Sequence, residues 1–191
     1  MDPKRQSSAA LPGFSAPAAG FDEPLEMLHA CHDRVRRSLD LLERICQRVE
    51  QSLVDQAVHS AAADVLHYFD RAAPHHHEDE EQHVFPRVLA GCDDPAVRAI
   101  VLALQEDHIA MESQWAALRT PLAALATGHG EGFDAAHLAA ARRFCALYAQ
   151  HAQTEEALVF PTASKLIDDD AKQAMGREMA TRRGARLMPP V

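Results

Sequence analysis

The sequence predicts an all-α protein, an antiparallel up-down four-helix bundle with an internal pseudo-twofold repeat. Apolar residues make up 47% of the 191 residues and aromatic residues only 5%, which favours helices over a strand-rich sandwich. Apolar side chains recur in alternating steps of four and three along four long stretches. Because short turn-like segments join these stretches, consecutive helices are expected to pack antiparallel with their apolar faces inward.

The chain is expected to contain one domain between two tails. Residues 1–20 are rich in Pro, Ala, Ser and Gly and show no apolar period, so we expect a flexible N-terminal segment. The bundle is expected to occupy residues 21–168. Residues 169–191 form a basic C-terminal tail, in which a short helix precedes a frayed end. The sequence leaves open whether this tail covers one end of the bundle.

The first two predicted helices have recognisable starts and one internal proline. The first begins near Asp22, which is expected to be its N-cap, with Pro24 in the opening turn. The second is expected over residues 56–90, and Gly91 ends it. Pro74 lies inside this second helix. Since proline has no backbone N–H and crowds the preceding turn, we expect a kink just before the neighbouring histidines.

The third predicted helix covers residues 95–126 and has the most regular apolar stripe. A glycine-rich turn follows at residues 127–132. The fourth helix continues from this turn to about Ile167. These two helices complete the predicted bundle.

Histidines and glutamates interrupt the apolar stripes of all four helices. A His and a Glu four residues apart on one helix differ by about 40° in direction and lie about 6 Å apart, so both point to the same place. Burying six such groups costs several kcal/mol unless each is paired or coordinated, and a metal cluster supplies that coordination. The interrupting residues are His32, His76, Glu80, His108, His151 and Glu155.

The second and fourth helices share the pattern H-x-x-x-E-E-x-x-x-F-P, which begins at His76 and at His151. The two copies are 75 residues apart, and the single histidines His32 and His108 are 76 residues apart. Each half of the chain therefore contributes one lone histidine and one H-x-x-x-E pair, as in an internal repeat. This arrangement suits two metal ions side by side that share the two glutamates as bridges.

A competing di-iron pattern is E-x-x-H on two helices, as in ferritin-like proteins, and Glu80 and His83 match it once. The fourth helix has Leu158 where the second histidine would stand. The ferritin-like pattern therefore fails in the second half of the chain, whereas H-x-x-x-E is present in both halves.

These motifs resemble those of haemerythrin-like proteins of the HHE cation-binding type, over roughly residues 22–167. The resemblance implies a four-helix bundle around a non-haem centre of two iron ions with an oxo or hydroxo bridge, for which manganese or zinc can substitute. By this resemblance the terminal imidazole ligands are His32, His76, His108 and His151, the bridging carboxylates are Glu80 and Glu155, and His77 is an additional terminal ligand.

The chain departs from the oxygen carriers of that family in two places. Glu112 stands one turn after His108, where those carriers have a second histidine. Glu155 and Glu156 follow His151, where those carriers place an aspartate five residues after the histidine. A ligand set poorer in histidine and richer in carboxylate favours sensing, redox or peroxide chemistry over simple reversible oxygen carriage.

Some coordination positions of such a centre are expected to remain open. Two near-octahedral ions need about twelve ligand positions, of which the residues named above fill about nine. Tyr148, one turn before His151, is placed to hydrogen-bond a species bound at an open position. The residues expected to wall the pocket are Leu104, Met111, Phe144 and Trp115.

Three function classes are consistent with these residues. The first is a di-iron protein that binds or senses O2, NO or peroxide, with slow oxidase or peroxidase turnover as an extension. The second is a non-catalytic metal-binding module for iron sensing or buffering. The third is a structural bundle in which the buried His and Glu side chains pair only with each other.

Charge and hydropathy argue against other classes. With 19 basic and 28 acidic residues the net charge is −9, which repels phosphate backbones and argues against a nucleic-acid partner. No run approaches the roughly 20 apolar residues of a membrane span, and residues 1–10 lack the apolar block of a signal peptide, so we expect a cytoplasmic protein with no membrane partner.

The four cysteines form no C-x-x-C pair. The expected partner is a small diatomic or peroxide ligand, and the sequence leaves open a protein partner and the choice between monomer and homodimer.

Overall fold

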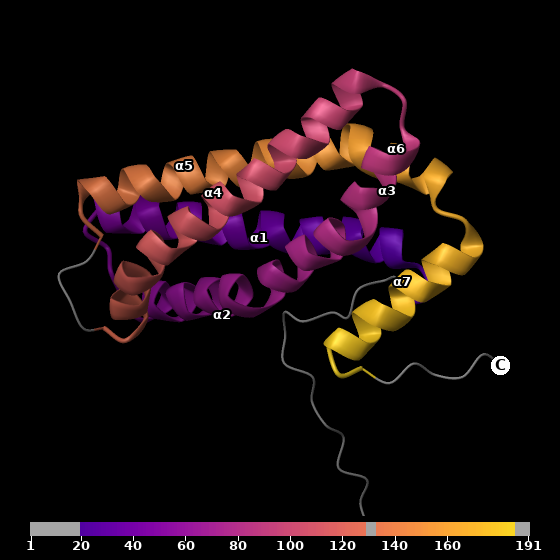
Figure 1. Cartoon of the computed structure of the whole chain (residues 1–191). Coiled ribbons are helices and arrows are strands. Elements are labelled where there is room, and N and C mark those ends of the chain that lie inside the picture. Colours follow the sequence, from indigo (N-terminus) through magenta and orange to yellow (C-terminus); the bar gives the residue numbers. More distant parts are fainter. Residues whose placement is uncertain (1–19, 129–132, 186–191) are drawn as a thin grey trace, which may run out of the picture.

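The computed structural model describes residues 20–128 and 133–185, and every regular element within them is helical. Four long helices lie lengthwise beside one another (Figure 1), with α1 and α4 each packed against both α2 and α5. Three shorter helices lie towards one end of the long ones. The elements are α1 (Pro24–Glu50), α2 (Gln56–Asp79), α3 (Phe85–Gly91), α4 (Pro95–Ala126), α5 (Ala135–Thr154), α6 (Phe160–Leu166) and α7 (Asp169–Arg182). The all-α prediction is confirmed.

Aspartate side chains begin four of these helices. Each accepts a hydrogen bond from a backbone N–H in the first turn, which would otherwise have no partner inside the helix. The four N-caps are Asp55, Asp94, Asp134 and Asp168. The start of α1 differs from the prediction, because its N-cap is Glu23 rather than Asp22 and makes no side-chain capping bond. Pro24 at the first position, whose φ is already helical, still favours the start there.

Two π-helical turns, η1 (Glu80–Val84) and η2 (Glu155–Val159), interrupt the second and fourth predicted helices. In each, the phenylalanine N–H that follows the turn donates to the carbonyl of its first glutamate. The next residue is proline, whose ring would crowd the carbonyl four residues earlier in a regular α-helix. A wider turn relieves this crowding, so the F-P of the repeated motif accounts for both turns. The two π turns therefore follow His76 and His151, and α2 is α-helical on both sides of Pro74.

The apolar core consists of two clusters separated by a polar layer. Along α1 and α4 the chain passes from the second cluster through a buried histidine to the first. From α2 through η1 to α3, and from α5 through η2 to α6, it passes in the opposite order. The polar layer is therefore covered by apolar side chains on both sides. The first cluster includes Leu42, Val65, Phe69, Leu118 and Phe144, and the second includes Leu28, Phe85, Leu104, Phe160 and Met179.

The tail that the sequence left unplaced is packed against the rest of the molecule. Helix α7 contributes Met175 and Met179 to the second apolar cluster. Next to them, Gly176 lies so close to the Phe21 carbonyl oxygen that a Cβ atom there would be 1.7 Å from it. The helix therefore covers the end of the molecule that holds the second cluster (Figure 1). The flexible segment predicted for residues 1–20 lies outside the described residues except for Gly20, as does the end of the chain after residue 185.

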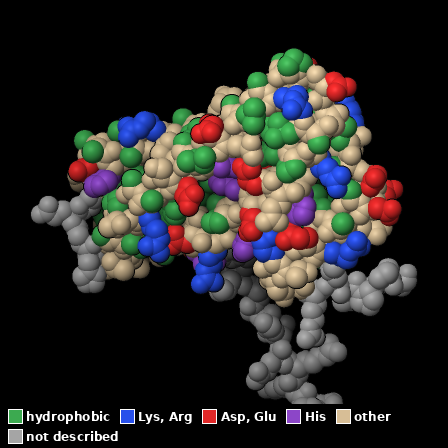
Figure 2. Space-filling view, in the orientation of Figure 1, with side chains coloured by type: hydrophobic (Ala, Val, Ile, Leu, Met, Phe, Trp, Pro, Cys, Tyr) green, Lys and Arg blue, Asp and Glu red, His purple; other side chains and the backbone are tan. Residues whose placement is uncertain are grey.

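On the face seen in Figure 2, charged side chains of both signs are scattered among apolar ones, and histidines lie beside acidic side chains near the middle. No helix in the described part of the chain combines the length and apolar character that a membrane span requires.

Candidate metal centre

The structure brings six of the seven predicted site residues into the polar layer between the two clusters. Each long helix contributes one histidine, and each π turn contributes its first glutamate. All six side chains are buried, and the most exposed of them, His108, is 7% exposed. Their donor atoms form two groups of four, within each of which every atom lies within 4.8 Å of the others. The first group is His32, His76, Glu80 and Glu155, and the second is Glu80, His108, His151 and Glu155.

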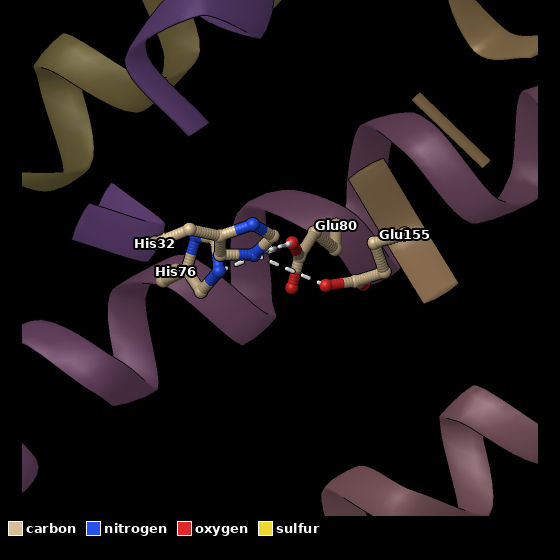
Figure 3. A group of neighbouring side chains, drawn as sticks. All are labelled: His32, His76, Glu80 and Glu155. Carbon is tan, nitrogen blue, oxygen red and sulfur yellow. Dashed lines mark ion pairs between the residues drawn. The ribbon is translucent and has the colours of Figure 1, made fainter. Parts of the chain in front are cut away.

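In the first group the two imidazoles point at the glutamates (Figure 3). The His76 Nε2 atom lies 3.2 Å from Glu80 Oε1. The His32 Nε2 atom lies 3.2 Å from Glu155 Oε2 and 3.9 Å from Glu80 Oε1. The pair four residues apart on one helix thus meets at one place, as the spacing predicted.

The second group uses the other oxygen of each glutamate. The His108 Nε2 atom lies 3.5 Å from Glu80 Oε2, and the His151 Nε2 atom lies 3.3 Å from Glu155 Oε1. The two Nε2 atoms are 3.0 Å apart. Each carboxylate therefore presents one oxygen to each group, which is the arrangement that a carboxylate bridging two cations requires.

The inner carboxylate oxygens and one inner nitrogen have no hydrogen-bond partners among the described residues. Both carboxylate oxygens of Glu80 and of Glu155 are buried without a donor, and so is the Nε2 atom of His32. Buried carboxylate oxygens without donors are strongly destabilising unless a cation or a proton compensates them. Four oxygens and four imidazoles facing one small volume form a donor set that suits a divalent transition metal. The residues present therefore fit a metal pair.

The outer nitrogens of three histidines face carboxylates. His32 Nδ1 lies 2.9 Å from Glu156 Oε1, and His108 Nδ1 lies 2.9 Å from Glu81 Oε1. His151 Nδ1 lies 3.4 Å from Asp107 Oδ2. Because a carboxylate only accepts, the proton of each neutral ring belongs on Nδ1 and the lone pair of Nε2 points into the centre.

His76 is the exception. Its Nδ1 atom is buried and has no hydrogen-bond partner within the described residues. The repeat explains the difference, because the residue 76 positions before Asp107 is Cys31, a weak hydrogen-bonding group in place of a carboxylate. The two groups therefore have similar inner donor atoms, but they differ in the side chains that lie beside the outer nitrogens of their histidines.

Burial and mutual repulsion shift the protonation of the centre. Burial, together with the charge of nearby Glu155, raises the pKa of Glu80 well above its ordinary value. Burial alone would also raise the pKa of Glu155, but the imidazoles of His151 and His32 lower it below its ordinary value. Burial lowers the pKa of His108 to about 2. Without a cation the centre favours a protonated Glu80 and neutral rings of His76 and His108, whereas, against the effect of burial, Glu155 and Asp107 raise the pKa of His151. A metal ion would therefore displace a proton on binding.

His77, the seventh predicted residue, lies outside both groups. Its ring stacks on that of His108 with the centroids 4.0 Å apart, and its Nε2 atom lies 3.2 Å from the Tyr148 hydroxyl. Burial lowers the pKa of His77 to about 4, so it is neutral near pH 7. The structure places it beside the second group, next to the tyrosine that the sequence put one turn before His151.

A cavity of about 510 Å³ borders the second group at His108 and His77. Met111, Trp115 and Tyr148 line it, as the sequence analysis expected of the first two. Leu104 and Phe144, which were also expected to wall the pocket, lie instead in the second and first apolar clusters. Both residues lie on the inward faces of their helices, as predicted, but at positions along the helix axis that do not border the cavity.

Sequence reasoning did not assign Asp107 a role and left those of Glu81 and Glu156 open. For the glutamates a signal was available, since both copies of the motif carry two consecutive glutamates of which only the first can share a direction with its histidine. For Asp107 the only signal in the sequence is its position next to His108. Its carboxylate lies instead beside Nδ1 of His151, which is on another helix.

Comparisons with known proteins agree with this geometry. A family model described as the Hemerythrin HHE cation binding domain matches residues 23–163. An uncharacterized protein of Haemophilus influenzae is 33% identical over 165 residues, which cover 86% of this chain and 92% of that protein. The residues matched by the family model include all six side chains of the two groups.

Proposed function

Because the chain belongs to the Hemerythrin HHE cation binding domain family, we propose that it is a non-haem di-iron protein that binds or senses O2, NO or peroxide. The observation that carries the proposal is the orientation of Glu80 and Glu155, each with one oxygen in each group of donors and neither with a hydrogen-bond donor. In this proposal His32 and His76 would hold the first ion, His108 and His151 would hold the second, and Glu80 and Glu155 would each offer a carboxylate oxygen to both. His77 is the candidate for an additional ligand of the second ion.

The fold supports this proposal as a four-helix bundle of two related halves. The alternating passage of the long helices between the two apolar clusters is the order expected of an up-down bundle. The repeated motifs and the two π turns support a pseudo-twofold relation between the halves. In such a bundle the lone histidine of each half of the chain lies against the two consecutive glutamates of the other half.

The chain's own residues prepare the centre in three ways. The carboxylates of Glu156, Glu81 and Asp107 accept hydrogen bonds from the Nδ1 atoms of three histidines. This keeps the Nε2 lone pair of each ring free to bind a cation. The three histidines are His32, His108 and His151. The two apolar clusters exclude water from both sides, which strengthens every charge interaction between them. When bound, an iron pair supplies redox-active metal with exchangeable positions for a small ligand. The cavity beside His108 gives such a ligand a route to the second ion.

Metal analysis joined to an optical titration tests the proposal. We expect about two irons per chain in protein purified without chelators, and a change in the optical spectrum of the ferrous form when NO or peroxide is added. Iron without any spectral change would instead support the second candidate, a non-catalytic module for iron sensing or buffering. Less than one metal ion per chain would overturn both and leave a structural bundle.

A further inference from the structure

The cavity beside the second group is larger than a diatomic ligand needs. Its volume is about 510 Å³, whereas a water molecule occupies about 30 Å³ of liquid volume. A volume of this size is typical of sites for small organic molecules. None of the first-group histidines lines it, so the cavity belongs to one half of the centre only.

Its lining combines apolar and acidic side chains. Phe69, Met111, Trp115 and Tyr148 supply apolar and aromatic surface. Glu78, Glu81 and Glu112 supply carboxylates, and none of the lining residues is Lys or Arg. The chain as a whole carries a net charge of −9. The field in this cavity therefore disfavours anions and favours a cation, which an aromatic face also attracts.

The three carboxylates differ in how far they are already paired. Glu78 accepts a hydrogen bond from Gln82 and lies 3.1 Å from a guanidinium nitrogen of Arg182. Glu81 is shared between Gln105 and His108. Glu112 is exposed and makes no ion pair or hydrogen bond within the described part of the chain. Glu112 is therefore the carboxylate whose charge is least compensated.

The other half of the centre has a cation at the corresponding place. Arg36 stands four residues after His32, as Glu112 stands four residues after His108. The Arg36 guanidinium pairs with Glu156, the carboxylate that holds His32. In the second half the carboxylate that holds His108 has a second acid nearby instead of an arginine. Arg36 therefore supplies a cation beside Glu156, whereas no Lys or Arg lines the cavity beside Glu81.

We propose that this cavity binds a small organic cation, an ammonium or guanidinium group on an apolar or aromatic body. The charged group lies between Glu81 and Glu112, in the place that Arg36 takes in the first half. The apolar body packs on Trp115 and Met111. This site goes beyond the proposed function, because it is formed by the cavity lining and does not require that the centre hold metal.

Trp115, the single tryptophan of the chain, lines the cavity and reports on occupancy by its fluorescence. The probes are 2-phenylethylammonium, its neutral analogue 2-phenylethanol and the anion phenylacetate, titrated into the full chain with its metal content measured. We expect saturable quenching or a spectral shift with the ammonium, at least tenfold weaker binding of the alcohol, and no binding of the anion. Equal affinity for the ammonium and the alcohol would overturn the proposal. So would a titration with the ammonium that does not saturate at concentrations up to about 10 mM.

Two variants of one exposed side chain localise the charge. Glu112→Gln is expected to weaken ammonium binding at least fivefold, and Glu112→Arg, which recreates the arrangement of the first half, is expected to abolish it. Glu106→Gln removes the same charge from the exposed face of the same helix, does not line the cavity, and should leave the dissociation constant within twofold. Unchanged binding in Glu112→Gln, or equal loss in Glu106→Gln, would show that the cation is not held at this place. Melting curves and metal content check that each variant is folded.

Discussion

The second glutamate of each repeated E-E pair acts on the lone histidine of the other half. Glu156 holds His32, and Glu81 holds His108, each at 2.9 Å through Nδ1. The first glutamate of each pair faces inward and the second faces the neighbouring helix. The same two adjacent residues therefore supply the proposed bridge and orient a proposed ligand, which explains why the pattern needs both of them.

The six inward residues were predictable because their spacing lies within single helices. His76 and Glu80 share a direction whatever the neighbouring helices do, since the helical period alone fixes it. The supporting contacts were not predictable in the same way. The bond between His151 and Asp107 depends on the relative height of α4 and α5, and helix spacing carries no information on that height.

At Glu156 the supporting role can be measured. We expect Glu156→Ala to weaken metal binding by about 10- to 100-fold, because His32 loses the carboxylate that fixes its ring and its Nδ1 proton. Asp33→Ala is the matched control, since Asp33 also pairs with Arg36 but does not contact His32. Competition with a metal-binding dye gives both affinities. An equal loss in the two variants would attribute the effect to surface charge and not to ring orientation.

Among the elements, the two π turns are the clearest departure from the sequence-based expectation. A periodic apolar stripe predicted one continuous helix in each half, and the helices do continue in direction far enough to carry Val84 and Val159 into the core. The change in hydrogen bonding arises from Pro86 and Pro161, which the apolar period cannot register. The sequence-based expectation considered proline only at Pro74 and did not extend the same reasoning to the F-P of each motif.

Helix α7 is held by a close backbone approach that the sequence pattern could not reveal. Gly176→Ala is expected to destabilise the protein by about 1–3 kcal/mol, because the new methyl group would overlap the Phe21 carbonyl oxygen. This loss would occur although alanine is favoured over glycine by about 1 kcal/mol inside a helix. Gln173→Ala on the exposed face of α7 is the control and should be neutral or slightly stabilising. Urea unfolding gives both values, and a Gly176→Ala variant as stable as the control would mean that α7 does not pack closely here.

At the scale of the whole molecule, a fully buried polar layer divides the apolar core into two. Such a layer is destabilising by itself, and its protonation couples the stability of the metal-free protein to pH. The pKa values of His76, His77 and His108 are lowered chiefly by burial, to about 4 for His77 and about 2 for His108. At pH 5.5 these rings stay neutral in the folded state, whereas the unfolded chain protonates them near its ordinary value of about 6.5.

The metal-free protein should therefore lose stability as the pH falls below about 6.5. Each of the three histidines lowers the free energy of unfolding as the pH falls. Glu80, whose pKa is raised by burial and by Glu155, and His151, whose pKa is raised against the effect of burial by Glu155 and Asp107, hold protons in the folded state and oppose part of the loss. The net decrease between pH 7 and pH 5.5 is expected to be on the order of 1 kcal/mol. Urea unfolding of chelator-treated protein at the two pH values measures it. His108→Ala should reduce this pH dependence and His75→Ala, whose side chain is 41% exposed, should leave it unchanged. A folded state that is equally or more stable at pH 5.5 would contradict the burial of neutral imidazoles in the polar layer.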